Sequence, residues 1–228
     1  MAELILALDL PAVRVAPLLD RIPGCRWVKV GSILFAEAGP ELVRALVGRG
    51  LAVFLDLKWH DIPNTVVGSV RAAAGLGVAM ATVHTLGGQE MMAAAVAAAG
   101  PMDLVGVTVL TSHSQGSYEA ATGRRGVVLL DEVSRLAESA RAAGLRGVVC
   151  SPLEVAAVKL RLAPGSVIVV PGIRRPGDPA ADQARTATPE AAVEAGATHL
   201  VVGRPILASP DPGGAFREMA AQVGGPGA

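Results

Sequence analysis

Residues 53–65 read VFLDLKWHDIPNT, and this stretch contains both units from which the fold is built. Its first part is a run of apolar residues, which is typical of a strand that is covered on both faces. Because side chains alternate along a strand, Asp56 and Lys58 share one face and the leucines beside them take the other. Pro63 then suits the first turn of a helix. The stretch therefore predicts a strand that ends in charged residues and leads directly into a helix.

The same succession of strand and helix recurs on both sides of this segment. Apolar residues spaced three and four apart predict helices at residues 40–49, 65–75, 131–143 and 189–196. Eight apolar runs separated by helical stretches predict an α/β protein, a single (β/α)8 barrel (TIM barrel) over residues 1–228. A doubly wound open sheet is the alternative. The predicted strands are residues 4–8, 27–30, 52–57, 79–84, 104–110, 147–150, 167–170 and 199–202.

The composition excludes several kinds of partner. The chain has 20 basic and 20 acidic residues, so no net positive field would attract nucleic acid or an anionic membrane.

No apolar run reaches the roughly 18 residues that a membrane-spanning helix needs, and the first residues resemble a strand more than a secretion signal. Cys25 and Cys150 lie far apart, which favours two buried thiols over a disulfide framework. We therefore expect a cytoplasmic protein.

Lysine is scarce in this sequence. Only three of the 20 basic residues are lysine, namely Lys29, Lys58 and Lys159. A lysine that is kept inside an apolar strand suggests chemistry that arginine lacks. Lysine can release a proton near neutral pH when its surroundings shift its pKa, whereas arginine effectively cannot. Lys58 is therefore the candidate proton donor.

Charged residues end the first three predicted strands, where a (β/α)8 barrel carries its active site. We expect Asp9, Lys29, Asp56 and Lys58 to meet there in a partly buried cluster of alternating charge. Such a cluster is costly to desolvate unless its members are well paired. An ion-pair network that only closes the top of the barrel is the alternative. Asp61 lies past the strand end and need not point into its own barrel; a loop cap or a helix N-terminal acidic residue is its alternative role.

Residues after the last two strands suggest a phosphate site. Gly203 allows close approach of the backbone to a ligand, and Arg204 adds a guanidinium. The long segment at residues 172–188 adds Arg174 and Gln183 after the neighbouring strand. Barrels often bind phosphate at these two loops. A solvated basic loop is the alternative.

Two hydroxyl groups follow the fifth predicted strand. Thr111 and Ser112 could contact a heterocycle, and ordinary strand-end capping is the alternative. Residues 113–125 are polar and contain glycine, so we expect a second long loop of functional importance here. The four histidines show no metal-ligand spacing, so we expect no metal site.

The stretch DLKWHDIPNTV at residues 56–66 resembles the signature of the orotidine 5′-phosphate decarboxylase family, in which Asp-x-Lys-x-x-Asp leads into Ile-Pro-Asn-Thr. The Asp-x-Lys-x-x-Asp core alone is shared with related phosphosugar enzymes, whereas the full set of motifs is specific. The resemblance extends over nearly the whole chain. The other matching motifs are LALD (6–9), KVG (29–31), VTVLTS (107–112), PGIR (171–174), DQAR (182–185) and VVGRPI (201–206).

This resemblance implies decarboxylation of orotidine 5′-phosphate to uridine 5′-phosphate without a cofactor. Lys58 would protonate the carbanion at C6, and Asp56 would face the carboxylate that leaves. Asp9 and Lys29 would contact the ribose hydroxyls and anchor the charges. The catalytic set implied by the family is therefore Lys29, Asp56, Asp61 and Lys58.

The resemblance also implies a homodimer with shared active sites. Asp61 and Thr65 would reach into the site of the partner subunit, and Thr111 and Ser112 would lie beside the pyrimidine. The loop after the seventh strand would close over the substrate. The residues implied to hold the 5′-phosphate are Arg174, Gln183, Gly203 and Arg204.

Two other functions stay open on the sequence. One is a related phosphosugar lyase, such as a 3-keto-gulonate 6-phosphate decarboxylase or a hexulose-phosphate synthase, which by resemblance needs Mg²⁺. The other is a non-catalytic barrel that binds a phosphorylated nucleotide. The Asp56–Lys58 pair speaks against mere binding, because binding needs no such buried charge.

Overall fold

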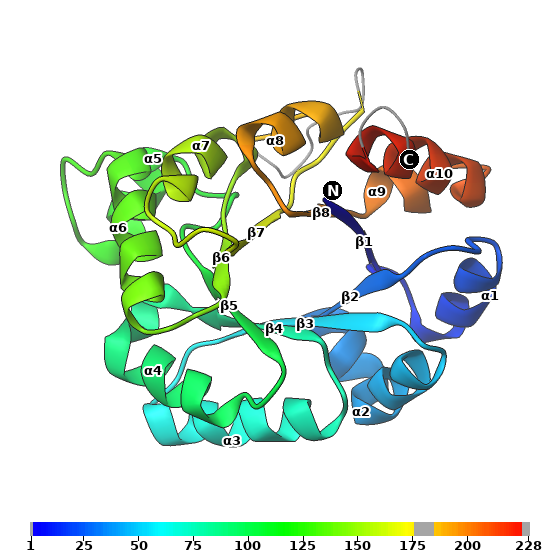
Figure 1. Cartoon of the computed structure of the whole chain (residues 1–228), viewed down its shortest axis with the longest axis horizontal. Helices are drawn as coiled ribbons and strands as arrows, with labels where there is room; N and C mark the ends of the chain where they lie inside the picture. The colour runs from blue at the N-terminus through cyan, green and yellow to red at the C-terminus, as the bar shows by residue number, and fades with distance from the viewer. Residues whose placement is uncertain (1, 176–184, 225–228) are drawn as a thin grey trace.

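Eight parallel strands close into a barrel, in which each strand pairs with the next and β8 pairs with β1 (Figure 1). The pairing of Glu3 with His199 excludes the open sheet and confirms the (β/α)8 barrel. The computed structural model describes residues 2–175 and 185–224. The strands are β1 (Glu3–Ala7), β2 (Trp27–Gly31), β3 (Ala52–Trp59), β4 (Met80–His84), β5 (Asp103–Val107), β6 (Gly147–Val149), β7 (Val167–Val170) and β8 (His199–Val202).

Helices surround the barrel and cover the outer faces of its strands (Figure 1). The last helix packs against α8, α9 and β1. In the described part of the chain, no helix combines the length and the apolar character that crossing a membrane requires. The helices are α1 (Val15–Asp20), α2 (Ser32–Gly48), α3 (Pro63–Gly75), α4 (Gly88–Ala98), α5 (Gln115–Thr122), α6 (Leu129–Ala142), α7 (Val155–Lys159), α8 (Pro189–Ala195), α9 (Arg204–Leu207) and α10 (Pro212–Gly224), with 3-10 turns η1 (Ala12–Arg14), η2 (Thr85–Gly87) and η3 (Pro152–Glu154).

Apolar side chains cover both faces of the strands. One layer lies between the strands and the helices, and a smaller layer fills the inside of the barrel. This double coverage explains why the strands are nearly continuous apolar runs. We call the inner layer the barrel plug; its members are Ile5, Ala7, Phe54, Met80, Val105, Val167, Val169 and Val201.

The strands follow the prediction closely except at β3 and β5. The bounds of β7 and β8 are those predicted, and β3 continues to Trp59. The predicted continuation of the fifth strand to residue 110 is wrong, because β5 ends at Val107. There the neighbouring β6 has only three residues, and the Thr108 N–H and hydroxyl both donate to the Val149 carbonyl. The strand therefore has no further ladder partner on that side.

The helices differ from the prediction mainly at α2, which begins at Ser32 and not at residue 40. Two helical segments meet at Gly39, whose φ of 61° favours glycine, and Pro40 follows at the start of the second segment. The prediction identified only that second segment. The start of α8 is confirmed, because the Thr188 side chain accepts the Ala191 N–H at 3.3 Å.

Both cysteines are free thiols. Cys150 is buried, which confirms the prediction, whereas Cys25 is only half-buried. Burial raises the pKa of Cys150 to about 12 and that of Cys25 to about 11. Neither forms a reactive thiolate near neutral pH.

Candidate active site

A cavity of about 400 Å³ opens at the C-terminal ends of β1, β2 and β3. The turn after β1 and the first turns of α2 complete its wall. Four side chains that the sequence singled out line this one cavity, and we call them the mouth array: Asp9, Lys29, Asp56 and Lys58. Charge is thus concentrated where a (β/α)8 barrel places its active site.

The end of β3 supplies the first pair of the mouth array. Lys58 Nζ donates to Asp56 Oδ2 at 2.8 Å, and the side chains are 39% and 14% exposed. Among the described residues, Lys58 alone has a positive φ without being glycine, at 52°. Such a backbone costs about 1–3 kcal/mol and persists where the surroundings impose it, often at functional sites. The pair therefore occupies a strained, partly desolvated position in which electrostatic attraction exceeds that in bulk water.

The second pair joins β2 to the turn after β1. Lys29 Nζ donates to Asp9 Oδ1 at 3.0 Å, and Lys29 is 12% exposed whereas Asp9 is 60% exposed. Gly31 makes room for this contact, because a Cβ at that position would lie 3.0 Å from Lys29 Nζ. Two ammonium and two carboxylate groups therefore surround one cavity, as we expected from the sequence.

Thr82 is a site residue that the sequence reasoning missed. It lies in β4 and is fully buried. Its hydroxyl accepts the Lys58 N–H at 2.8 Å and donates to Asp56 Oδ1 at 3.1 Å. The only signal in the sequence was a hydroxyl residue flanked by apolar residues within a strand.

Two histidines stack next to this pair. The rings of His60 and His84 lie 5.4 Å apart at 24°, and His84 Nδ1 accepts the Leu86 N–H at 3.3 Å. Burial, and then electrostatic repulsion from His60 and Lys58, lower the pKa of His84 to about 4. His84 is therefore neutral at physiological pH. Within residues 2–175 and 185–224, no group of three His, Cys, Asp or Glu side chains is arranged to hold a metal ion.

The structure does not bring Asp61 and Thr65 into the cavity of their own chain. Both residues are exposed, Asp61 just before α3 and Thr65 in its first turn. Asp61 Oδ1 accepts the Ile62 N–H at 2.7 Å, so its carboxylate also caps the local turn. Their exposure leaves both side chains accessible to another molecule.

The segment after β5 is more ordered than the sequence suggested. Thr111 is half-buried and Ser112 is exposed, both in a turn. The expected long loop at residues 113–125 is wrong, because it contains α5. Ser114 and Ser117 cap this helix reciprocally at its start. This side-chain capping stabilises a polar helix that hydrophobic periodicity does not reveal.

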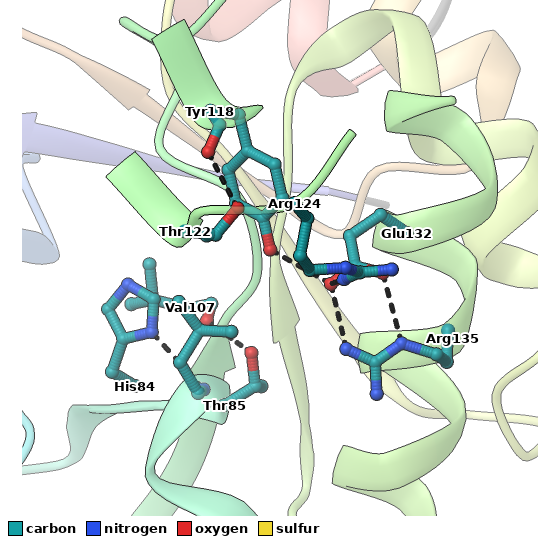
Figure 2. Close-up of polar contacts among 9 residues, drawn as sticks. His84, Thr85, Val107, Tyr118, Thr122, Arg124, Glu132 and Arg135 are labelled. Atoms are coloured by element: carbon teal, nitrogen blue, oxygen red, sulfur yellow. Dashed lines mark hydrogen bonds and ion pairs between the residues drawn. The ribbon is translucent and has the colours of Figure 1, made fainter. Parts of the chain in front are cut away.

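A buried carboxylate fastens α5 to α6 (Figure 2). Glu132 is 3% exposed and accepts the Tyr118 hydroxyl at 2.8 Å and Arg135 Nη2 at 2.7 Å. Arg124 Nη1 lies 2.7 Å from the same oxygen. The hydrogen bonds from Arg135, and then from Arg124 and Tyr118, lower the pKa of Glu132 to about 2 against the opposing effect of burial. We call these four residues the α5–α6 tether, and it fixes the segment that follows Ser112.

The residues predicted to hold phosphate follow β7 and β8. Gly203 lies near the mouth array, because a Cβ there would be 3.5 Å from Asp9 Oδ2. Arg204 begins α9 and is exposed, whereas Arg174 is buried and donates from Nη1 to the Ile173 carbonyl at 2.8 Å. The remaining residue of this group, Gln183, lies outside the described residues.

Arg185 has a structural contact that the sequence did not reveal. Its guanidinium forms an ion pair with the buried Glu154 and donates to the Leu110 carbonyl at 3.1 Å. Glu154 also accepts the Ser151 N–H at 2.9 Å. The chain leading into α8 is thereby joined to the segments that follow β5 and β6.

The closed barrel and its charged cavity define this chain as a (β/α)8-barrel protein with an enzyme-like site at the C-terminal ends of its strands. A family model described as the Orotidine 5′-phosphate decarboxylase / HUMPS family matches residues 2–219. The chain belongs to this family. The match covers every strand and all four residues of the mouth array.

Individual proteins are similar over nearly the full length. The orotidine 5′-phosphate decarboxylase of Halorhodospira halophila is 50% identical, over 99% of this chain and 97% of its own. That of Anaeromyxobacter sp. (strain K) is also 50% identical, over 94% and 95%. The crystal structure of orotidine 5′-phosphate decarboxylase from Lactobacillus acidophilus matches with a TM-score of 0.86 at 35% identity, over 98% of this chain and 99% of that chain.

Proposed function

We propose that this chain decarboxylates orotidine 5′-phosphate to uridine 5′-phosphate, a step of pyrimidine nucleotide biosynthesis. One observation carries the proposal: the Lys58 ammonium lies 2.8 Å from the Asp56 carboxylate at the wall of the 400 Å³ cavity. Ligand binding alone needs no partly buried charge pair, whereas decarboxylation needs charge placed beside the reacting carbon. The relatives that share half of the sequence bear the name of this enzyme.

Lys58 supplies both charge and proton in the proposed reaction. When the bond between C6 and the carboxylate carbon breaks, CO₂ leaves and the electron pair stays on C6. The ring offers no easy electron sink and the proposed route uses no cofactor, so fixed protein charges must stabilise the carbanion. The Lys58 ammonium does so and then transfers one proton to C6. The resulting amine regains a proton from solvent before the next turnover.

The other members of the mouth array support this step. Asp56 would lie beside the substrate carboxylate, and loss of CO₂ relieves the repulsion between the two negative charges. Lys29 and Asp9 would anchor the array and contact the ribose hydroxyls. Their ion pair at 3.0 Å and the low exposure of Lys29 support a fixed position for its ammonium.

Substrate binding would extend from the mouth array around the C-terminal ends of the strands. Thr111 and Ser112, after β5, would contact the pyrimidine. Binding energy from the distant phosphate would hold the reacting ring in place. The proposed phosphate ligands, after β7 and β8, are Arg174, Gln183, Gly203 and Arg204.

We propose a homodimer in which Asp61 and Thr65 complete the site of the partner subunit. Both are exposed and lie outside the cavity of their own chain, which supports this role. Three exposed apolar side chains, Ile33, Ile62 and Leu86, follow the ends of β2, β3 and β4 and are 87%, 67% and 42% exposed. A partner surface covering them would bury apolar area, as dimer interfaces do.

We further propose that residues 1–228 act as one barrel in the cytoplasm. Elements from β1 to α10 belong to one closed barrel and its helices, which supports a single unit. Both thiols are free and have raised pKa values, which is consistent with a reducing compartment.

An assay with EDTA present tests the proposed function. The protein is incubated with orotidine 5′-phosphate, the absorbance change is followed, and uridine 5′-phosphate and CO₂ are quantified. We expect stoichiometric formation of both products. Activity only on a phosphosugar and only with Mg²⁺ would favour the related lyases, and nucleotide binding without a spectral change would favour a non-catalytic barrel.

A further inference from the structure

Thr82 lies outside the cavity lining, where it can control the geometry of the Asp56–Lys58 pair. Its side chain is fully buried in β4 and does not line the cavity. A buried hydroxyl is stable only when it is hydrogen-bonded, and both of its partners belong to that pair. The hydroxyl therefore contacts the Asp56 carboxylate and the Lys58 backbone without lining the cavity proposed for the substrate.

The β3–β4 ladder is irregular at this position. Leu55 pairs with Ala81 and Trp59 pairs with Val83, so β3 advances four residues while β4 advances two. Thr82 faces the extra residues of β3. Its hydroxyl accepts the Lys58 N–H at 2.8 Å, at the residue whose φ is 52°. A side-chain oxygen thus satisfies a backbone donor where the regular ladder is interrupted.

The hydroxyl of Thr82 accepts one hydrogen bond and donates the other. A threonine hydroxyl has one hydrogen to donate. An ionised carboxylate can only accept, so the hydroxyl donates this hydrogen to Asp56 Oδ1 at 3.1 Å while it accepts the Lys58 N–H. The other carboxylate oxygen, Oδ2, accepts Lys58 Nζ at 2.8 Å. One hydroxyl therefore restricts the rotation of the Asp56 carboxylate and also fixes the backbone of Lys58.

We propose that Thr82 is a positioning residue for the decarboxylation, and this inference rests on the proposed function. It directs Asp56 Oδ2 toward Lys58 Nζ and holds the strained β3 bulge that presents the ammonium to the cavity. Without the hydroxyl, the carboxylate can rotate and the bulge can relax. The proton donor is then misplaced while the binding groups on the other strands stay in position.

The test compares three variants. Thr82→Val keeps the shape and removes the hydroxyl, and Thr82→Ser restores the hydroxyl. Thr85→Val is the matched control, because the buried Thr85 hydroxyl donates to the Val107 carbonyl at 2.7 Å and not to a charged group (Figure 2). For each, kcat and KM for orotidine 5′-phosphate, Kd for uridine 5′-phosphate and Tm are measured.

We expect Thr82→Val to lower kcat by about 100-fold, the size of effect that a displacement near 1 Å can have. Its KM and product Kd should stay within about threefold, because uniform binding is unchanged. Thr82→Ser should recover kcat to within about threefold, and Thr85→Val should keep kcat while lowering Tm. If Thr82→Val does not fold, Thr82→Ala compared with Thr82→Ser isolates the same hydroxyl.

Three results would overturn the role of Thr82: a wild-type kcat in Thr82→Val, an equal loss in Thr82→Ser, or an equal loss in Thr85→Val. Each of these presupposes that the wild-type protein converts orotidine 5′-phosphate. A wild-type protein without that activity would instead overturn the proposed function, and the role of Thr82 with it.

Discussion

The barrel plug and the mouth array occupy the same inner face of the barrel but differ completely in chemistry. On β3, Phe54 belongs to the plug and is 1% exposed. Two residues further along the same face comes Asp56, and two further comes Lys58. The inner surface thus changes from closed and apolar to charged within one strand. From this difference we propose that the plug supplies stability and that the mouth array supplies activity.

The backbone shows the same contrast. The plug side of β3 is in regular register with both neighbours, with Phe54 opposite Lys29 on β2 and Met80 on β4. At the mouth side, the register with β4 shifts and Lys58 takes its positive φ. Local strain of this kind requires a rigid surround to persist. The plug and the outer helix layer provide that rigid surround. The end of β3 can therefore keep an irregular register and a strained backbone.

The largest expected effect is on the mouth alone. Lys58→Ala should lower kcat by at least about 10⁴-fold, because proton donation and charge stabilisation are lost together. Binding of uridine 5′-phosphate should remain measurable by calorimetry, since the proposed phosphate ligands are intact. The control is Lys159→Ala, which removes an exposed lysine on α7 and should leave kcat unchanged. Substantial residual activity in Lys58→Ala would contradict the assignment of the donor.

The mouth, unlike the plug, should depend on a second chain. Mixing Lys58→Ala with Asp61→Ala protein and allowing subunits to exchange should restore about a quarter of wild-type activity, because half of the dimers are mixed and one of their two sites is intact. Sedimentation velocity on the same samples checks that dimers are present. Mixtures that stay as inactive as their parents, in spite of exchange, would argue against shared sites.

Damage to the plug should have the opposite signature. Phe54→Ala should lower the free energy of unfolding by about 3–5 kcal/mol, through lost burial and the cavity left behind. Urea unfolding measures this, and Phe54→Leu, which keeps most of the volume, should lose much less. The kcat per folded molecule should stay near that of the wild type. A plug variant with normal stability and a low kcat would contradict the assignment of stability to the plug and activity to the mouth array.

The smallest effect concerns acid stability, which should depend on the α5–α6 tether, outside both regions. The pKa of Glu132 is lowered from 4.5 to about 2, so its contribution is present above pH 4.5 and is lost as the pH falls toward 2. Glu132→Gln should cost about 2 kcal/mol at pH 7, allowing for the exposed arginine partners, and should flatten the fall in stability over that range. Unfolding titrations at several pH values measure both. An unchanged acid profile in Glu132→Gln would contradict this attribution.

The sequence was sufficient for the features that depend on local pattern. Continuous apolar runs predicted the bounds of β7 and β8 correctly. The alternation of side chains along β3 predicted that Asp56 and Lys58 share one face, and both line the same cavity. Helix α5 escaped prediction because serine caps and the tether stabilise it, and neither has an apolar period. Thr82 was also out of reach, since its partners depend on the register shift between β3 and β4. What was missed are a local serine capping box without an apolar pattern and contacts between residues distant in sequence.

The most direct measurement of the central claim is a crystal structure with uridine 5′-phosphate bound. The distance from Lys58 Nζ to C6 of the pyrimidine decides it. A nitrogen within about 3–3.5 Å of C6, in line for proton transfer, is the result that we predict. A nitrogen beyond about 4.5 Å, outside contact with the ring carbon while the nucleotide occupies the cavity, would contradict the role of Lys58.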